Sequence, residues 1–230
     1  MPMIDKEKHK IILVKILKEI YTTPSLRNVL GFKGGTAAFL FYDLPRISVD
    51  LDFDLLAGDK KDISLKLAKI LPQFGDLQDK RDKRYTLFFL ISPKKGERKI
   101  KIEVSKRKTA AAYKVRSYLG IPMLVMAEDD MTAGKLSAFL TRKKFAARDL
   151  FDLWFFLKND WEINEKLVLE KTGLSFKKAV KKAIGKLKKI KKRQLLQGLG
   201  ELLDEKQKQW VRENLVRELM FYLKLKIRGG

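Results

Sequence analysis

The sequence contains no cysteine and only one histidine, His9. The absence of cysteine excludes disulfides, Cys-based zinc sites and thiol nucleophiles. The single histidine lies in a lysine-rich amino-terminal segment, so a Ser-His-Asp hydrolase is close to excluded. These two shortages remove the commonest forms of nucleophilic catalysis.

Long hydrophobic runs are also missing. No stretch of eighteen or more apolar residues occurs, and the first ten residues are charged without an apolar, signal-like stretch after them. We therefore expect a cytoplasmic protein that does not enter a membrane. The chain has 230 residues, 45% of them hydrophobic, which is enough to fill the core of one large or two small domains.

Acidic residues are scarce relative to basic ones. The sequence has 51 Lys and Arg against 28 Asp and Glu, a formal net charge of +23. This excess goes beyond what solubility needs and favours a polyanionic partner such as RNA. The alternative is a heat-adapted surface, but such surfaces usually gain glutamate together with lysine. The deficit of acids therefore favours nucleic acid.

The acids that are present form a row in the segment 48–56, where Asp50, Asp52 and Asp54 alternate with apolar residues. Successive side chains of a strand point to opposite faces, so one face is carboxylate and the other is core. Like charges this close repel each other, and clustered carboxylates suit Mg²⁺ better than zinc or copper. A solvated face at a sheet edge is the structural alternative.

Hydrophobic periodicity divides the chain into two parts. Up to residue 125, apolar patterns predict strands alternating with helices, and from Glu128 onward they predict helices alone. We expect an α/β (α+β) domain over residues 1–125 and a helical domain over 126–230. The expected strands are 29–32, 47–55, 85–91 and 99–104, with a loop at 92–96. The expected helices are 9–21, 36–42, 63–74, 135–140, 147–157, 164–172, 176–196 and 201–227.

A further carboxylate, Glu103, lies on the polar face of the strand 99–104. It joins the first row if the two strands are neighbours. Asp50, Asp52 and Glu103 then have the composition of a site for two Mg²⁺ ions about 4 Å apart, which serves phosphoryl or nucleotidyl transfer.

Two glycines, Gly34 and Gly35, stand between an expected strand and an expected helix. Such a turn lets backbone amides approach a phosphate at the start of a helix. Glycines in turns are also common for purely structural reasons. No Gly-Lys-Ser/Thr sequence follows, so the turn is not a P-loop.

Several motifs in order along the chain resemble the AbiEii toxin family, within the polymerase-β-like nucleotidyltransferase superfamily. The resemblance spans residues 31–157. The motifs are Gly34-Gly-Thr-Ala-Ala, Arg46-Ile-Ser-Val-Asp-Leu-Asp-Phe53, Ala133-Gly-Lys-Leu-Ser-Ala138, Arg142 and Arg148-Asp-Leu-Phe-Asp-Leu-Trp154.

The resemblance implies a polymerase-β-like nucleotidyltransferase domain with a mixed sheet, followed by a helical C-terminal domain. It implies that Lys135 contacts a nucleotide phosphate and that Asp149 lies beside it. Gly134 stands where an acidic residue is frequent in the family, and Asp54 falls outside the metal-binding pair. The implied metal ligands are Asp50, Asp52 and Glu103; the implied catalytic set adds Lys135 and Asp149; the residues bordering the nucleotide are Gly34, Gly35 and Thr36.

Three further features of the sequence allow both a functional and a structural interpretation. Arg46 and Ser48 either position the acidic strand or a nucleotide phosphate, or simply form a turn and the start of a strand. Arg148, Asp149 and Asp152 have the spacing of an intrahelical ion-pair network as well as of a functional motif. The segment 177–193 holds ten basic residues and no acid, which fits either an RNA-binding face or a solvated cationic helix.

The sequence thus favours an enzyme, a Mg²⁺-dependent nucleotidyltransferase that moves a nucleoside monophosphate from an NTP to an acceptor hydroxyl. By family analogy the acceptor is the 3′ end of a tRNA and the protein is a toxin with a cognate antitoxin. Two alternatives stay open: a non-catalytic RNA-binding or regulatory module, and a metal-dependent nuclease.

Overall fold

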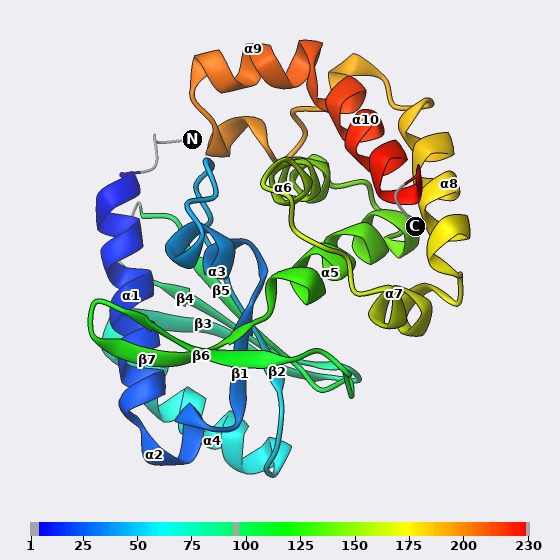
Figure 1. Cartoon of the computed structure of the whole chain (residues 1–230). Helices are drawn as coiled ribbons and strands as arrows, with labels where there is room; N and C mark the ends of the chain where they lie inside the picture. The colour runs from blue at the N-terminus through cyan, green and yellow to red at the C-terminus, as the bar shows by residue number, and fades with distance from the viewer. Residues whose placement is uncertain (1–4, 94–96, 229–230) are drawn as a thin grey trace. The chain divides into compact units, whose positions relative to one another are not determined.

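The computed structural model describes residues 5–93 and 97–228 (Figure 1), so the expected loop at 92–96 lies largely outside the described residues. The chain divides into two compact units, Met1–Met126 and Ala127–Gly230. The first unit contains a mixed sheet with helices, and the second unit is helical. The predicted mixed α/β fold class is confirmed.

The first unit is organised around one sheet, which has seven strands within the described residues, in the order β3-β4-β5-β2-β1-β7-β6. The strands are β1 Leu30–Lys33, β2 Leu51–Leu55, β3 Asp76–Lys83, β4 Thr86–Ser92, β5 Ile100–Ser105, β6 Tyr113–Tyr118 and β7 Ile121–Met126. The helices are α1 Lys6–Thr22, α2 Pro24–Arg27, α3 Gly34–Phe41 and α4 Lys60–Ile70, with a 3-10 turn η1 at Leu71–Phe74.

Strand β2 lies in the interior of the sheet, antiparallel to β1 and parallel to β5. Its apolar side chains Leu51 and Phe53 are fully buried, and the Tyr21 ring of α1 lies 6.5 Å from the Phe53 ring. Helix α1 buries Leu13, Ile16, Leu17 and Ile20 at helical spacing. One face of β2 therefore belongs to the core that α1 completes, and the aspartates lie on the opposite face.

The predicted strand 47–55 is wrong at its start, because β2 begins only at Leu51. The carbonyls that precede it are bonded by side chains instead of a neighbouring strand. His9 Nε2 lies 3.0 Å from the Val49 carbonyl, Thr36 Oγ1 donates to the Asp50 carbonyl, and Arg46 Nη1 donates to the Ile47 carbonyl. Over this segment, side chains therefore take the place of the backbone hydrogen bonds that a neighbouring strand would make.

Three strands of the first unit were not predicted. Strands β6 and β7 form a hairpin whose two-residue turn, Leu119-Gly120, has positive φ at both positions, 49° and 78°. This is the backbone of a tight hairpin turn. The edge strand β3 consists mainly of charged residues and is largely exposed, so it lacks the apolar alternation by which strands are recognised.

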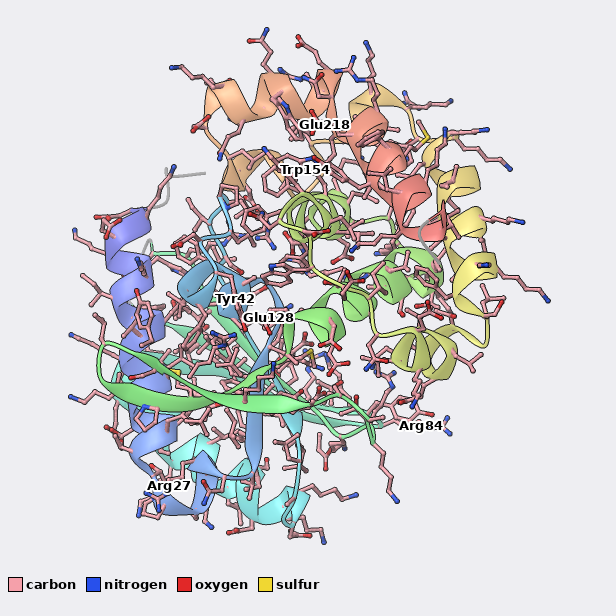
Figure 2. All side chains as sticks on the ribbon, viewed as in Figure 1. Arg27, Tyr42, Arg84, Glu128, Trp154 and Glu218 are labelled. Carbon is pink, nitrogen blue, oxygen red and sulfur yellow. The ribbon has the colours of Figure 1, made fainter. Side chains whose placement is uncertain are left out.

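The second unit consists of helices: α5 Glu128–Thr141, α6 Ala147–Lys158, α7 Glu165–Thr172, α8 Phe176–Leu187, α9 Glu205–Glu213 and α10 Leu215–Arg228, with 3-10 turns η2 Lys192–Gln194 and η3 Gly200–Leu202. Helix α6 contacts α5 and α10. Trp154 of α6 donates from Nε1 to Glu218 of α10 at 2.8 Å, and Figure 2 labels both side chains. Within the described residues, no helix combines the length and apolar character needed to cross a membrane.

Three predicted helices of this unit are wrong in extent. The helix expected over 135–140 is the second half of α5, which begins at Glu128. The helix expected over 176–196 ends at Leu187, where a run of like charges follows. The helix expected over 201–227 is divided by a capping box, in which Asp204 accepts from the Gln207 amide and Gln207 accepts from the Asp204 amide. This reciprocal pair starts α9 as a separate helix.

Candidate active site

The structure brings the three predicted carboxylates of the first unit onto neighbouring strands. Strand β2 pairs in parallel with β5, and Asp52 and Glu103 are Cα partners in that pairing. Asp50 directly precedes β2 on the same polar face as Asp52. The three acidic residues therefore lie on one face of the sheet, although Asp52 and Glu103 are far apart in the sequence.

A lysine that sequence reasoning did not select lies between them. Lys101 Nζ of β5 is 3.3 Å from Asp50 Oδ2 and 3.3 Å from Glu103 Oε2. Burial lowers the pKa of Lys101, but the charges of Asp50, Asp52 and Glu103 outweigh this effect, so its pKa lies above the ordinary value. Lys101 thus carries a positive charge at the centre of the carboxylates.

The mutual repulsion of the carboxylates is visible at Asp52. Burial raises the pKa of the Asp52 carboxyl, and the charges of Asp50 and Glu103 raise it further, against the opposing effect of Lys101 and Lys33. A positive charge at this position therefore stabilises the ionised forms of the three side chains.

Asp54, the third member of the sequence row, has different partners. Its carboxylate pairs with Lys33 Nζ at 2.5 Å and accepts a hydrogen bond from Tyr113 Oη at 2.5 Å. Its side chain is 3% exposed, against 19% for Asp50 and 31% for Glu103. Asp54 is therefore satisfied by the protein, whereas Asp50 and Glu103 retain access to solvent.

The two glycines lie directly beside the carboxylates, at the start of α3. Gly34 has a φ of +80°, and a Cβ added there would lie 2.8 Å from Asp52 Oδ2. A Cβ at Gly35 would lie 2.5 Å from Arg46 Nη2 and 2.9 Å from Ser48 Oγ. A side chain at either position would displace these neighbours, and Gly34 is favoured also by its backbone conformation.

Thr36, Arg46 and Ser48 are buried, with exposed fractions of 1%, 4% and 8%. The hydroxyls of Thr36 and Ser48 share a hydrogen bond of 2.9 Å, and Thr36 also holds the Asp50 carbonyl. These contacts join the start of α3 to the segment that carries Asp50. This geometry supports a positioning role for Ser48 on the acidic segment.

The other predicted residues, Lys135 and Asp149, lie in the second unit. Lys135 Nζ of α5 is 2.7 Å from Asp152 Oδ2 and 3.3 Å from Asp149 Oδ1, and both aspartates belong to α6. Arg142 Nε forms an ion pair with Asp149 Oδ2 at 3.1 Å. These ion pairs join α6 to α5 and to the residue that follows α5.

The carboxylate set fits a hard divalent cation in its chemistry, because it offers several anionic oxygens on one face next to backbone that can be approached closely. Within residues 5–93 and 97–228, no three His, Cys, Asp or Glu side chains are arranged so that they could hold a metal ion as they stand. The ammonium group of Lys101 is the cation that the structure places among them.

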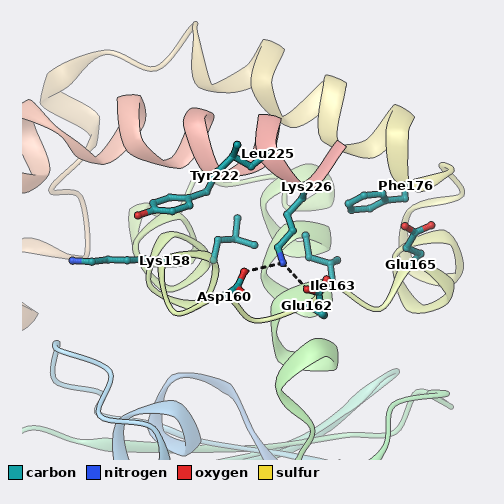
Figure 3. A pocket seen from close by; sticks show the side chains of 10 residues that line it. Lys158, Asp160, Glu162, Ile163, Glu165, Phe176, Tyr222, Leu225 and Lys226 are labelled. Carbon is teal, nitrogen blue, oxygen red and sulfur yellow. Dashed lines mark hydrogen bonds and ion pairs between the residues drawn. The ribbon is translucent and has the colours of Figure 1, made fainter. Parts of the chain in front are cut away.

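A cavity of about 650 Å³ in the second unit is lined by none of the residues that the sequence predicted for the active site (Figure 3). It lies beside Tyr222, Phe176 and the ion pairs of Lys226 with Glu162 at 2.7 Å and Asp160 at 3.4 Å. Lys226 is therefore paired with both Glu162 and Asp160 at this cavity.

Two solved structures resemble this fold. The crystal structure of JHP933 from Helicobacter pylori has 22% sequence identity and a TM-score of 0.63, covering 97% of this chain and 92% of that one. A second Helicobacter pylori protein, described as a candidate nucleotidyltransferase, has 23% identity and a TM-score of 0.62, covering 97% and 95%. The architecture is thus shared with nucleotidyltransferase-like proteins.

Residues 15–219 match the family described as "Nucleotidyl transferase AbiEii toxin, Type IV TA system". The chain belongs to this family of nucleotidyltransferases, and the resemblance seen in its motifs is confirmed. A comparison with curated proteins finds no match.

Sequence reasoning missed the partners of the acidic residues. Lys101 stands two residues before Glu103, on the same face of the strand, and a lysine at that spacing from a candidate ligand is the signal that could have identified it. Asp152 and Arg142 were part of quoted motifs, but their shared contact with the Lys135–Asp149 pair depends on how α5 and α6 pack. Tyr113 reaches Asp54 from a strand that was not predicted.

Proposed function

We propose that this protein is a Mg²⁺-dependent nucleotidyltransferase that transfers a nucleoside monophosphate from an NTP to an acceptor hydroxyl of RNA, with the 3′ end of a tRNA as the acceptor. In this proposal it acts in the cytoplasm as the toxin of a toxin–antitoxin pair. Family membership supports the reaction class and an antitoxin partner. The net charge of +23 supports an RNA acceptor.

The observation that carries the proposal is the pairing of Asp52 with Glu103, next to Asp50 and beside the close turn at Gly34 and Gly35. A carboxylate set for a cation and a turn without side chains for a triphosphate then occupy adjacent positions. A nuclease needs only the first of these features, because hydrolysis of a polymer involves no triphosphate. The combination therefore favours transfer over hydrolysis.

The proposed metal ligands are Asp50, Asp52 and Glu103. When bound, Mg²⁺ would neutralise phosphate charge and lower the pKa of the attacking hydroxyl. The remaining roles belong to the protein. Gly34 and Gly35 leave room for phosphate oxygens at the start of α3, where backbone N–H groups favour an anion. Thr36, Arg46 and Ser48 hold the segment that carries Asp50.

Lys135 is the proposed phosphate contact of the second unit. Its side chain is 14% exposed and lies between two buried aspartates. These carboxylates fix its position, so that it can act as an oriented point charge. Asp149 belongs to this arrangement as a residue that positions Lys135.

The function is tested by incubating the purified protein with Mg²⁺, unfractionated tRNA and each radiolabelled NTP in turn. We expect label to appear in full-length RNA with one NTP or a subset, to depend on Mg²⁺ and to be lost with EDTA. Sequencing of the 3′ ends should locate the added nucleotides. Shortened RNA on a denaturing gel would instead indicate a nuclease, and RNA of unchanged length with every NTP would contradict the proposed reaction on this acceptor.

The position of Lys101 leads to a prediction about metal binding that does not depend on activity. Lys101→Met removes the cation between the carboxylates, so without Mg²⁺ we expect a stability loss of about 1 to 3 kcal/mol and a melting temperature lower by several degrees. Because Mg²⁺ would replace the missing charge, adding it should raise the melting temperature of the variant more than that of the wild type.

Lys99→Met is the matched control, since Lys99 is exposed and lies two residues earlier in the chain. Its melting temperature should change little, with or without Mg²⁺. Equal effects of Mg²⁺ on Lys101→Met and on the wild type would show that the metal does not take the place of the ammonium group.

A further inference from the structure

Residues 177–193 form an exposed basic surface on the second unit. Helix α8 buries Ala179, Val180, Ala183 and Leu187 and contacts α5, α7 and α10. Its lysines other than Lys186 are exposed, and nitrogen-tipped side chains extend outward from α8 in Figure 2. The basic surface consists of the exposed residues Lys177, Lys178, Lys181, Lys182, Lys188, Lys189, Lys191, Lys192 and Arg193.

One basic residue of this segment has a different role. Lys186 Nζ donates to the Phe139 carbonyl at 2.7 Å and to the Leu140 carbonyl at 3.2 Å, at the end of α5. It therefore caps a neighbouring helix, as a cation near a helix C-terminus does. The lysines of the basic surface make no comparable contribution to packing.

The lysines of α8 oppose the stability of their own helix. Lys177 and Lys181, and likewise Lys178 and Lys182, are like charges one turn apart, which destabilise a helix by a few tenths of a kcal/mol per pair. The first turn contains no acidic residue, and the Ser175 side chain makes no capping hydrogen bond. The positive end of the helix is thus faced by further positive charge. Folding alone does not account for this arrangement, whereas a bound polyanion offsets the repulsion.

We propose that the basic surface binds the phosphate backbone of RNA; this inference rests on the proposed function, in which RNA carries the acceptor hydroxyl. The lysines neutralise phosphates and release condensed cations, so the surface holds RNA without reading its sequence. The basic surface supplies affinity, and the carboxylate site supplies the chemistry.

The composition of the surface distinguishes RNA from other polyanions. None of the large exposed hydrophobic side chains lies within residues 177–193, because the apolar side of α8 is buried. Protein interfaces have an apolar core and are depleted in lysine, and membrane-bound helices insert apolar side chains. A surface of lysines without exposed apolar groups matches a phosphate backbone better than it matches either alternative.

The test measures tRNA binding as a function of salt. Fluorescein-labelled, unfractionated tRNA is titrated with the full chain between about 50 and 200 mM salt, and affinity is obtained from fluorescence anisotropy. The surface variant replaces Lys177, Lys178, Lys181 and Lys182 with glutamine. The control variant replaces Lys15, Lys18, Lys61 and Lys69, exposed lysines of α1 and α4, with glutamine and so has the same net charge.

For the surface variant we expect the slope of log affinity against log salt to fall by about 0.7 to 0.9 for every phosphate that the lysines no longer neutralise, up to about 3 in total. At 0.1 M salt this corresponds to roughly fivefold weaker binding per phosphate. The control variant should keep most of the wild-type slope. The melting temperature of the surface variant should be equal to or above that of the wild type, because repulsive pairs are removed.

Two results would overturn the proposal: equal reductions of affinity in both variants, which would assign binding to diffuse net charge, and an unchanged slope in the surface variant. A parallel titration with poly-glutamate covers an acidic protein partner. If poly-glutamate binding, but not tRNA binding, disappears in the surface variant, the surface belongs to an acidic protein and the RNA assignment is wrong.

The experiments distinguish an error in the role of the basic surface from an error in the proposed function. Asp52→Asn should bind tRNA with the wild-type salt slope although it transfers no nucleotide. If the wild type extends no RNA but its tRNA binding still depends on the basic surface, only the proposed reaction fails. If the wild type extends tRNA and the surface variant does so with an unchanged KM for tRNA, only the proposed role of the basic surface is wrong. Loss of a contact that holds tRNA equally before and during the reaction would raise this KM.

Discussion

Replacement of Asp52 by asparagine is expected to lower kcat for nucleotide transfer by about three orders of magnitude or more. Asparagine has the same shape but lacks the charge that a divalent cation requires, and a bound metal supplies several kcal/mol of transition-state stabilisation, of which about 4 kcal/mol corresponds to a thousandfold rate. Asp50→Asn should behave in the same way. The measurement is the single-turnover rate of label transfer to tRNA at saturating NTP and Mg²⁺.

Asp54→Asn is the matched control on the same strand face. Asp54 is held by Lys33 and Tyr113, so this variant should lose about 1 to 3 kcal/mol of stability but keep activity within a few-fold of the wild type below its melting temperature. More than a tenth of wild-type activity in Asp52→Asn, or equal losses of activity in all three variants, would contradict the assignment of Asp50 and Asp52 as the reactive pair.

Lys135→Met is expected to destabilise the second unit by about 3 to 5 kcal/mol, the usual cost of removing one partner from a buried ion pair. The side chains of Asp149 and Asp152 are 2% and 0% exposed, so two buried carboxylates would each lose an ion pair, although Asp149 keeps its pair with Arg142. A loss of this size is a large part of the stability of an ordinary domain. Urea denaturation followed by far-UV circular dichroism measures it.

A compensating variant separates this electrostatic cause from a general loss of packing. In Lys135→Met combined with Asp149→Asn and Asp152→Asn, no unpaired carboxylate is left in the interior, and Arg142, which loses its ion pair with Asp149, is 46% exposed. Most of the stability should therefore return. Lys143→Met, at an exposed lysine after α5, should change stability by less than about 0.5 kcal/mol. A loss below about 1 kcal/mol in Lys135→Met would show that its ion pairs do not stabilise the unit.

The polar face of the site could be predicted because strand periodicity is a local property. Alternation alone placed Asp50, Asp52 and Glu103 on polar faces, and two adjacent glycines marked a turn. The pairing of Asp52 with Glu103 could not be derived from either segment, because strand order and register are set by the packing of the whole sheet. The bridging position of Lys101 follows from that pairing and was missed with it.

Parts of the fold escaped prediction for identifiable reasons. Strand β3 is a charged edge strand with no buried side chain, so it has no apolar pattern. The late start of β2 depends on Thr36 and His9, which hold its preceding carbonyls from other elements. By contrast, the Asp204–Gln207 capping box is a local signal that was present in the sequence and was overlooked.

The parallel pairing of β2 with β5 also fixes the moment during protein synthesis at which the acidic site forms. The polypeptide emerges from the ribosome amino terminus first, and α4, β3 and β4 lie between these two strands. At translation rates of about 5 to 20 residues per second, Asp52 precedes Glu103 by roughly 3 to 10 s. Until β5 has emerged and paired with β2, the nascent chain presents separated carboxylates and not the assembled acidic site. A protein that recognises the assembled centre can therefore engage this chain only after that point of translation.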